Sequence, residues 1–135
     1  MIAFGMGKKI VNMYNNKEAV IFALSGQLGS GKTTFAQGFA KGLGVAEVVL
    51  SPTFVIMKSY VVLMGGRRLY HIDCYRIHGI EDLVELGWEN IVQDPNNIVL
   101  LEWSERIRHS LPDSTIAIDF RVIEQGKRTL TITEP

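Results

Sequence analysis

One short segment constrains the fold more than any other: an apolar run followed closely by a glycine-rich loop that ends in Lys-Thr. The run Ala19–Leu24 is entirely apolar and contains β-branched residues, which predicts a strand buried on both faces. The loop Gly26–Thr33 matches the pattern G-x-x-x-x-G-K-S/T at every fixed position. Phe35, Phe39 and Leu43 then recur at helical spacing. A buried strand, a phosphate-binding loop and an amphipathic helix in this order predict an α/β fold that binds a nucleotide.

The residue types in this loop suit the binding of phosphate groups. Its glycines let successive backbone N–H groups point at one anion, at the N-terminus of the following helix. We expect the Lys32 ammonium to reach the β- and γ-phosphates and the Thr33 hydroxyl to ligate Mg²⁺. Because no N-K-x-D motif follows the loop, adenine is favoured over guanine. The residues predicted to hold ATP here are Gly26, Gln27, Leu28, Gly29, Ser30, Gly31, Lys32, Thr33 and Thr34.

Two carboxylates on predicted strands are candidates to complete the site. A phosphate loop needs an acid at the tip of a neighbouring strand, which holds the magnesium shell or orients the attacking water. Glu102 directly follows the apolar run Ile98–Leu101, and Asp73 lies on the predicted strand Arg68–Tyr75. The alternative is that each carboxylate only caps a helix or is solvated. We take Asp73 and Glu102, together with Lys32, as the candidate catalytic residues.

Four further features of the sequence are candidate parts of the site. Ser51–Thr53 offers hydroxyls that could sense the γ-phosphate, although an ordinary turn is the alternative. His71 lies two residues before Asp73 and so shares its strand face, where a hydrogen-bonded structural role is favoured over zinc binding. Cys74 is expected to be a small core residue. Trp103 either packs against the site or serves a partner.

The remaining hydrophobic pattern places further strands and a helix around the first strand. The sequence predicts strands over Phe54–Leu63, Arg68–Tyr75, Ile98–Leu101, Thr115–Ile123 and Arg128–Thr133, and a helical region over Glu81–Val92. This order predicts a three-layer α/β sandwich whose mixed sheet has a parallel core and antiparallel hairpins. A chain of 135 residues has room for one core, so we expect a single domain over residues 1–135.

The charge and apolar patterns exclude several classes of protein. Fourteen basic and fourteen acidic residues give a formal net charge of zero, which disfavours a protein that grips a nucleic-acid backbone. The longest apolar runs fall far short of the about 20 residues that a membrane span needs, and no signal-peptide pattern opens the chain. A single cysteine suits a reducing compartment. We therefore expect a cytoplasmic protein without a membrane partner.

Several of these segments together resemble one family. The segments Gly26–Phe35, Ser51–Phe54, His71–Arg76 and Leu101–Trp103 resemble, in order and spacing, the motifs of the TsaE family. Members of this family are small bacterial ATPases required for the threonylcarbamoyladenosine modification of tRNA. The resemblance implies a P-loop NTPase fold, binding and slow hydrolysis of Mg²⁺-ATP, and docking onto the TsaD and TsaB proteins, with tRNA contacted at most indirectly.

The resemblance also implies roles for individual residues. Thr33 and Glu102 lie on the magnesium side, Asp73 is a catalytic acid, and Thr53 belongs to a nucleotide-sensing loop. Gln27 departs from the family pattern, which usually has Asp at that position. Without the resemblance, the residues support a magnesium-dependent P-loop NTPase, with a small-molecule kinase and a nucleotide-gated binding module as alternatives.

Overall fold

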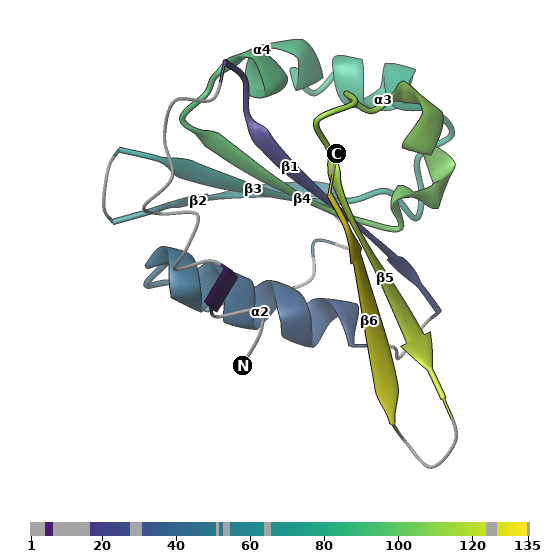
Figure 1. Cartoon of the computed structure of the whole chain (residues 1–135). Helices are drawn as coiled ribbons and strands as arrows, with labels where there is room; N and C mark the ends of the chain where they lie inside the picture. The colour runs from purple at the N-terminus through teal and green to yellow at the C-terminus, as the bar shows by residue number, and fades with distance from the viewer. Residues whose placement is uncertain are drawn as a thin grey trace.

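A computed structural model of the chain describes residues 5–6, 17–27, 31–50, 52, 55–63, 66–123 and 127–134. Within these ranges the strands form one six-stranded sheet in the order β2-β3-β4-β1-β5-β6 (Figure 1). The strands are β1 (Val20–Gly26), β2 (Met57–Val61), β3 (Arg68–Asp73), β4 (Asn97–Glu102), β5 (Ile116–Val122) and β6 (Arg128–Thr133). The four central strands are parallel, and the edge strands β2 and β6 pair antiparallel with their neighbours. This confirms the predicted mixed sheet.

Helices cover both faces of this sheet, so the molecule has three layers (Figure 1). The helix α2 (Lys32–Leu43) lies on one face. The short helices α3 (Ile80–Val84) and α4 (Trp88–Gln93) and the 3₁₀ turns η1 (Ser104–Arg106) and η2 (Arg108–Ser110) lie on the other. None of the helices in the described ranges combines the length and apolar character that crossing a bilayer requires.

The alternation of side chains along the central strands builds a separate core on each face. Phe22 of β1 and Leu100 of β4 pack with Phe39 on the side of α2. Ile21 and Val99, one residue before each of those strand residues, belong to the second core beneath the short helices. Both strands are therefore apolar on both sides, as the continuous hydrophobic runs of the sequence predict for buried parallel strands.

The helical region predicted over Glu81–Val92 is two short helices rather than one. Gly87 lies between them with a φ of 93°, a left-handed conformation that ends the helical path. Glycine adopts this conformation without the steric cost that a Cβ brings. The strand predicted over Arg68–Tyr75 likewise ends earlier, at Asp73, because the Asp73 carboxylate accepts a hydrogen bond from the backbone N–H of Tyr75 and turns the chain.

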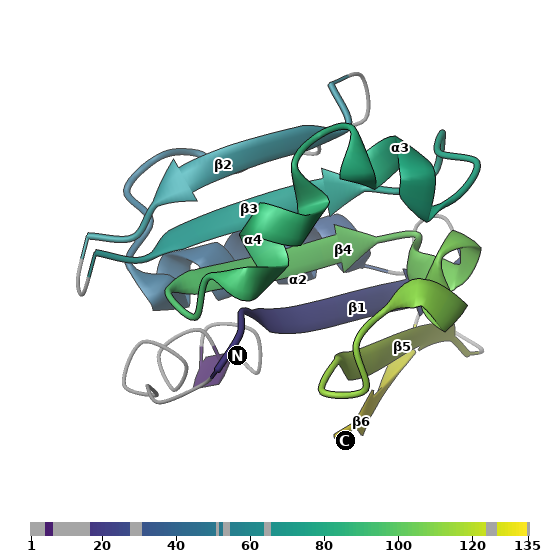
Figure 2. The same cartoon turned by 90° about the horizontal axis from the view of Figure 1, so that it is seen from above.

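The parallel core brings the carboxyl ends of three strands to one edge of the sheet. β1, β3 and β4 run in the same direction, so Gly26, Asp73 and Glu102 come at the ends of neighbouring strands (Figure 2). The register pairs Asp73 directly with Glu102. Because α2 begins six residues after β1 ends, its N-terminus lies at the same edge. This is the edge at which open parallel sheets bind ligands.

Candidate functional site

The helix α2 begins directly after a glycine in the left-handed conformation. Gly31 precedes the helix with a φ of 101°, and its carbonyl oxygen accepts the backbone N–H of Phe35 at 2.9 Å. The first N–H groups of a helix have no partners within the helix, so they are available to an anion. Thr33 and Thr34 are exposed in this first turn. The predicted binding residues Leu28, Gly29 and Ser30 lie outside the described residues.

Lys32 is a buried cation at this edge. Its side chain is 5% exposed, its Nζ donates to the carbonyl oxygen of Gly26 at 2.5 Å, and Nζ lies 3.4 Å from the centroid of the Trp103 ring. Burial lowers the pKa of Lys32, and three carboxylates oppose that shift, in decreasing order Glu105, Glu102 and Asp73. The site therefore holds one ammonium group among several carboxylates.

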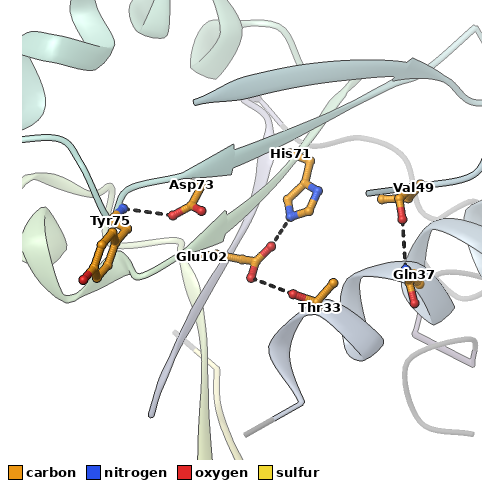
Figure 3. A network of polar contacts seen from close by, with 7 residues as sticks. All are labelled: Thr33, Gln37, Val49, His71, Asp73, Tyr75 and Glu102. Carbon is orange, nitrogen blue, oxygen red and sulfur yellow. Dashed lines mark hydrogen bonds and ion pairs between the residues drawn. The ribbon is translucent and has the colours of Figure 1, made fainter. Parts of the chain in front are cut away.

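Glu102 is held between two polar side chains, one on each of its oxygens (Figure 3). The Thr33 hydroxyl lies 3.5 Å from Oε1, and His71 Nε2 lies 2.5 Å from Oε2. Glu102 is 3% exposed and His71 is fully buried. Strand alternation explains the arrangement, because His71 and Glu102 both lie on the face that α2 covers. The histidine therefore has the hydrogen bond that the sequence favours, and its partner is the candidate metal-side acid.

Asp73 lies beside Glu102 but makes a different contact. Its Oδ1 accepts the backbone N–H of Tyr75 at 2.9 Å, and its side chain is buried. Its charge also acts on Lys32. The structure thus brings Lys32, Thr33, Asp73 and Glu102 to one edge of the sheet, while Thr53 lies outside the described residues.

The oxygens of Thr33 and Glu102 form a donor set that suits magnesium. Mg²⁺ prefers hard oxygen ligands and is usually held by one or two protein groups, with water and substrate phosphates completing its shell. The described part of the chain contains no group of three or more His, Cys, Asp or Glu side chains that could hold a metal. A metal here would therefore take most of its ligands from outside the protein.

A contact between two tilted aromatic rings next to the site was not predicted from the sequence. The rings of Tyr75 and Trp103 lie 5.1 Å apart, and the Arg106 guanidinium lies 5.6 Å from the centroid of Tyr75. The Lys32 ammonium contacts the other ring of the pair, that of Trp103. One feature of the sequence could have indicated this contact: each ring follows a candidate acid, Asp73 or Glu102, within two residues, and these acids end two paired strands. Trp103 therefore packs against the site.

Beside the loop, an open hollow of about 830 Å³ extends toward β5 and β6. Gly26 and Gln27 line it on one side, and Trp103 also contributes. Two further lining residues are bonded to each other, since the Ser25 hydroxyl donates to Asp119 Oδ1 at 3.1 Å. The hollow has room for groups larger than a phosphate.

Comparisons with known proteins agree on one family. Residues 3–130 match the family described as "Threonylcarbamoyl adenosine biosynthesis protein TsaE". The chain is 37% identical over 116 residues to tRNA threonylcarbamoyladenosine biosynthesis protein TsaE of Treponema pallidum, covering 86% of this chain and 83% of that protein. It is 37% identical over 117 residues to the TsaE protein of Bacillus subtilis, covering 87% and 71%.

A longer sequence match and a solved structure extend this agreement. The TsaE protein of Haemophilus influenzae is 30% identical over 135 residues, covering 99% of this chain and 84% of that protein. The crystal structure of YdiB from Bacillus subtilis superposes with a TM-score of 0.69 at 30% identity, covering 98% of this chain and 78% of the other. The likeness therefore includes the fold as well as the sequence.

Proposed function

The chain belongs to the TsaE family, and from this premise we propose that it is a magnesium-dependent P-loop ATPase that serves the threonylcarbamoyladenosine modification of tRNA. One observation carries the ATPase part of the proposal. Lys32, Thr33 and the buried carboxylate of Glu102 meet where the parallel central strands of the sheet end. This is the set of groups that phosphoryl transfer from a nucleotide requires.

Each group has a part that follows from its place. Lys32 would neutralise charge on the β- and γ-phosphates, and its burial strengthens that interaction because less water screens it. Thr33 and Glu102 would hold Mg²⁺, which when bound neutralises charge on the transferring phosphoryl group. Glu102 or Asp73 would accept a hydrogen bond from a water molecule and orient it in line with the bond that breaks.

We propose that the protein works through the TsaD and TsaB proteins rather than by gripping tRNA. The formal net charge of zero supports this, since proteins that bind a phosphate backbone usually carry a basic excess. A cytoplasmic location and a nucleotide-sensing loop at Ser51–Phe54 are part of the same proposal. The loop itself lies largely outside the described residues.

The direct test is hydrolysis of ATP by the purified chain, with and without Mg²⁺ and with and without TsaD and TsaB. Lys32→Ala should abolish both tight Mg²⁺-ATP binding, measured by calorimetry, and release of ADP. The matched control is Lys41→Ala, which removes an exposed lysine at the other end of the same helix. Binding and turnover unchanged in Lys32→Ala would refute the site assignment.

The same experiment separates the two alternative functions. A small-molecule kinase would consume ATP only when a phosphoryl acceptor is added. A nucleotide-gated binding module would bind Mg²⁺-ATP tightly but release no ADP, even with both partner proteins present.

A further inference from the structure

We infer that His71 is a positioning residue for Glu102: it binds one carboxylate oxygen and so directs the other toward Thr33. This inference rests on the proposed function, because it assigns His71 a part in the same magnesium-nucleotide site. His71 itself contacts neither the phosphate loop nor the first turn of α2 through any hydrogen bond in the described residues.

The two carboxylate oxygens of Glu102 face different partners. His71 pairs with Leu100 in the β3–β4 register, two residues before Glu102 and on the same face. Its Nε2 reaches diagonally to Oε2 at 2.5 Å, while Oε1 faces the Thr33 hydroxyl at 3.5 Å (Figure 3). One oxygen is thus committed to the protein interior, and the other points to the place where we propose that magnesium binds.

The contact with Glu102 determines which ring nitrogen of His71 carries the hydrogen. A carboxylate can only accept, so the contact requires a hydrogen on Nε2. In the part of the chain that the structure describes, His71 Nδ1 is buried and has no hydrogen-bond partner. A hydrogen on Nδ1 would be an unsatisfied buried donor, which is costly, so the ring hydrogen that fits the site is the one on Nε2. His71 is therefore a fixed donor and not a relay between two groups.

Without the His71 donor, the Glu102 side chain would lose its orientation toward Thr33. Its side chain is only 4% exposed, so Oε2 would lose its partner in a buried position. The Lys32 ammonium lies within electrostatic reach of the carboxylate. A freed Glu102 would turn toward that charge and away from Thr33, because a buried carboxylate oxygen needs a partner. The first consequence would be weaker magnesium binding, with little change in nucleotide binding in the absence of metal.

Two conservative substitutions distinguish positioning from simple packing. In His71→Gln the amide nitrogen can take the place of Nε2, whereas in His71→Asn it lies near the place of Nδ1 and does not reach Glu102. We expect His71→Asn to raise the Mg²⁺ concentration that half-saturates ATP hydrolysis by about 10-fold or more, and His71→Gln to stay within about threefold of wild type. His109→Asn, at an exposed histidine, is the matched control.

A readout without turnover is calorimetric binding of ADP, with and without Mg²⁺. His71→Asn should bind metal-free ADP as the wild type does and lose most of the gain in affinity that Mg²⁺ provides. A merely structural histidine would give equal losses in the Gln and Asn variants, tracking their thermal midpoints, and that result would overturn the inference. So would an unchanged Mg²⁺ dependence in His71→Asn.

A further measurement on the wild-type protein needs no variant to fold. Long-range ¹H–¹⁵N correlations of the His71 ring should show a slowly exchanging hydrogen on Nε2 and none on Nδ1, and the opposite tautomer would overturn the inference. The two proposals fail in different ways. If the wild type neither binds nor hydrolyses Mg²⁺-ATP, both fail; if it does both, and Glu102→Gln lacks hydrolysis while His71→Asn behaves as wild type, only the His71 inference fails.

Discussion

The ammonium of Lys32 lies against the face of the Trp103 ring, with Nζ 3.4 Å from the ring centroid. This contact joins the start of α2 to the residue after β4. It depends on an unusual backbone, because Trp103 has a φ of 57°, in the left-handed region that bulky residues rarely adopt. Strain of this kind persists where the surrounding structure holds it, and it concentrates at functional sites. Burying the charged ammonium of Lys32 destabilises the folded state.

Replacing Lys32 by Met should stabilise the fold while it removes nucleotide binding. The pKa of Lys32 lies below its ordinary 10.5, chiefly because burial disfavours the charged form. The folded state therefore binds this proton less tightly than the unfolded chain does. At any pH where the lysine is charged in both states, its burial destabilises the folded state by the full amount. We expect the thermal midpoint to rise by roughly 2–4 °C at neutral pH.

The stabilisation by Lys32→Met should depend on pH. As pH rises through the lowered pKa of Lys32 toward 10.5, the penalty relaxes, so the advantage of Lys32→Met should shrink. Calorimetric unfolding at several pH values measures this difference, with Lys41→Met as the control for loss of a charge on the same helix. A midpoint equal to or below that of the wild type at neutral pH would contradict the argument.

Glu102→Gln should reduce hydrolysis far more than nucleotide binding. The amide keeps the shape of the side chain and can still accept a hydrogen bond from His71, but it lacks the negative charge. Charge terms that act in the transition state typically contribute about 10²-fold or more. Single-turnover hydrolysis and calorimetric binding of Mg²⁺-ATP measure the two effects separately.

The control for that experiment is Glu89→Gln, an exposed glutamate of α4. Single-turnover rates of Glu102→Gln within about twofold of wild type would reduce Glu102 to a strand-end residue and transfer the proposed role to Asp73.

The site groups were foreseeable because they follow from strand ends. An acid that directly follows four apolar residues lies at the tip of a buried strand, and parallel strands present their tips at one edge. That reasoning predicted Glu102 as an acid at the phosphate loop, and the structure has its carboxylate in contact with the Thr33 hydroxyl. Asp73 was expected only to lie on a strand, and the structure adds that it pairs with Glu102 in the β3–β4 register.

Other contacts could not be read from the sequence, for physical reasons. The bond from His71 to Glu102 depends on the register between β3 and β4, which sequence alone leaves open. The contact between Lys32 and Trp103 depends on the left-handed backbone at Trp103, which residue preferences argue against. The helical region predicted over Glu81–Val92 is helical but divided in two, because Gly87 adopts a left-handed conformation that the hydrophobic pattern does not reveal.

That glycine supports a stability prediction. Gly87 has a φ of 93°, and in the described structure a Cβ there would meet nothing within 4 Å, so the cost of substitution is conformational rather than steric crowding by neighbours. Gly87→Ala should therefore lower the free energy of unfolding by about 1 kcal/mol. Gly87→Asn should lose less, since asparagine tolerates this conformation. Urea unfolding of both variants measures the difference, and equal losses would contradict a conformational cause.

The single cysteine offers a probe of the second core. Cys74 is fully buried, and burial, reinforced by the nearby charges of Asp73, Glu105 and Glu102, raises the pKa of its thiol to about 12. Since the thiolate is the reactive form, labelling of the folded protein by a thiol reagent at pH 8 should be at least about 100-fold slower than that of a free cysteine. In denaturant the same thiol should react at the ordinary rate. Because the pKa of the folded thiol is raised, the contribution of protonated Cys74 to the stability of the fold is complete below pH 9. That contribution is lost as pH rises toward 12. A folded protein that labels as fast as the denatured chain would show that the core around β3 opens readily, and the burial argument for Cys74 would then fail.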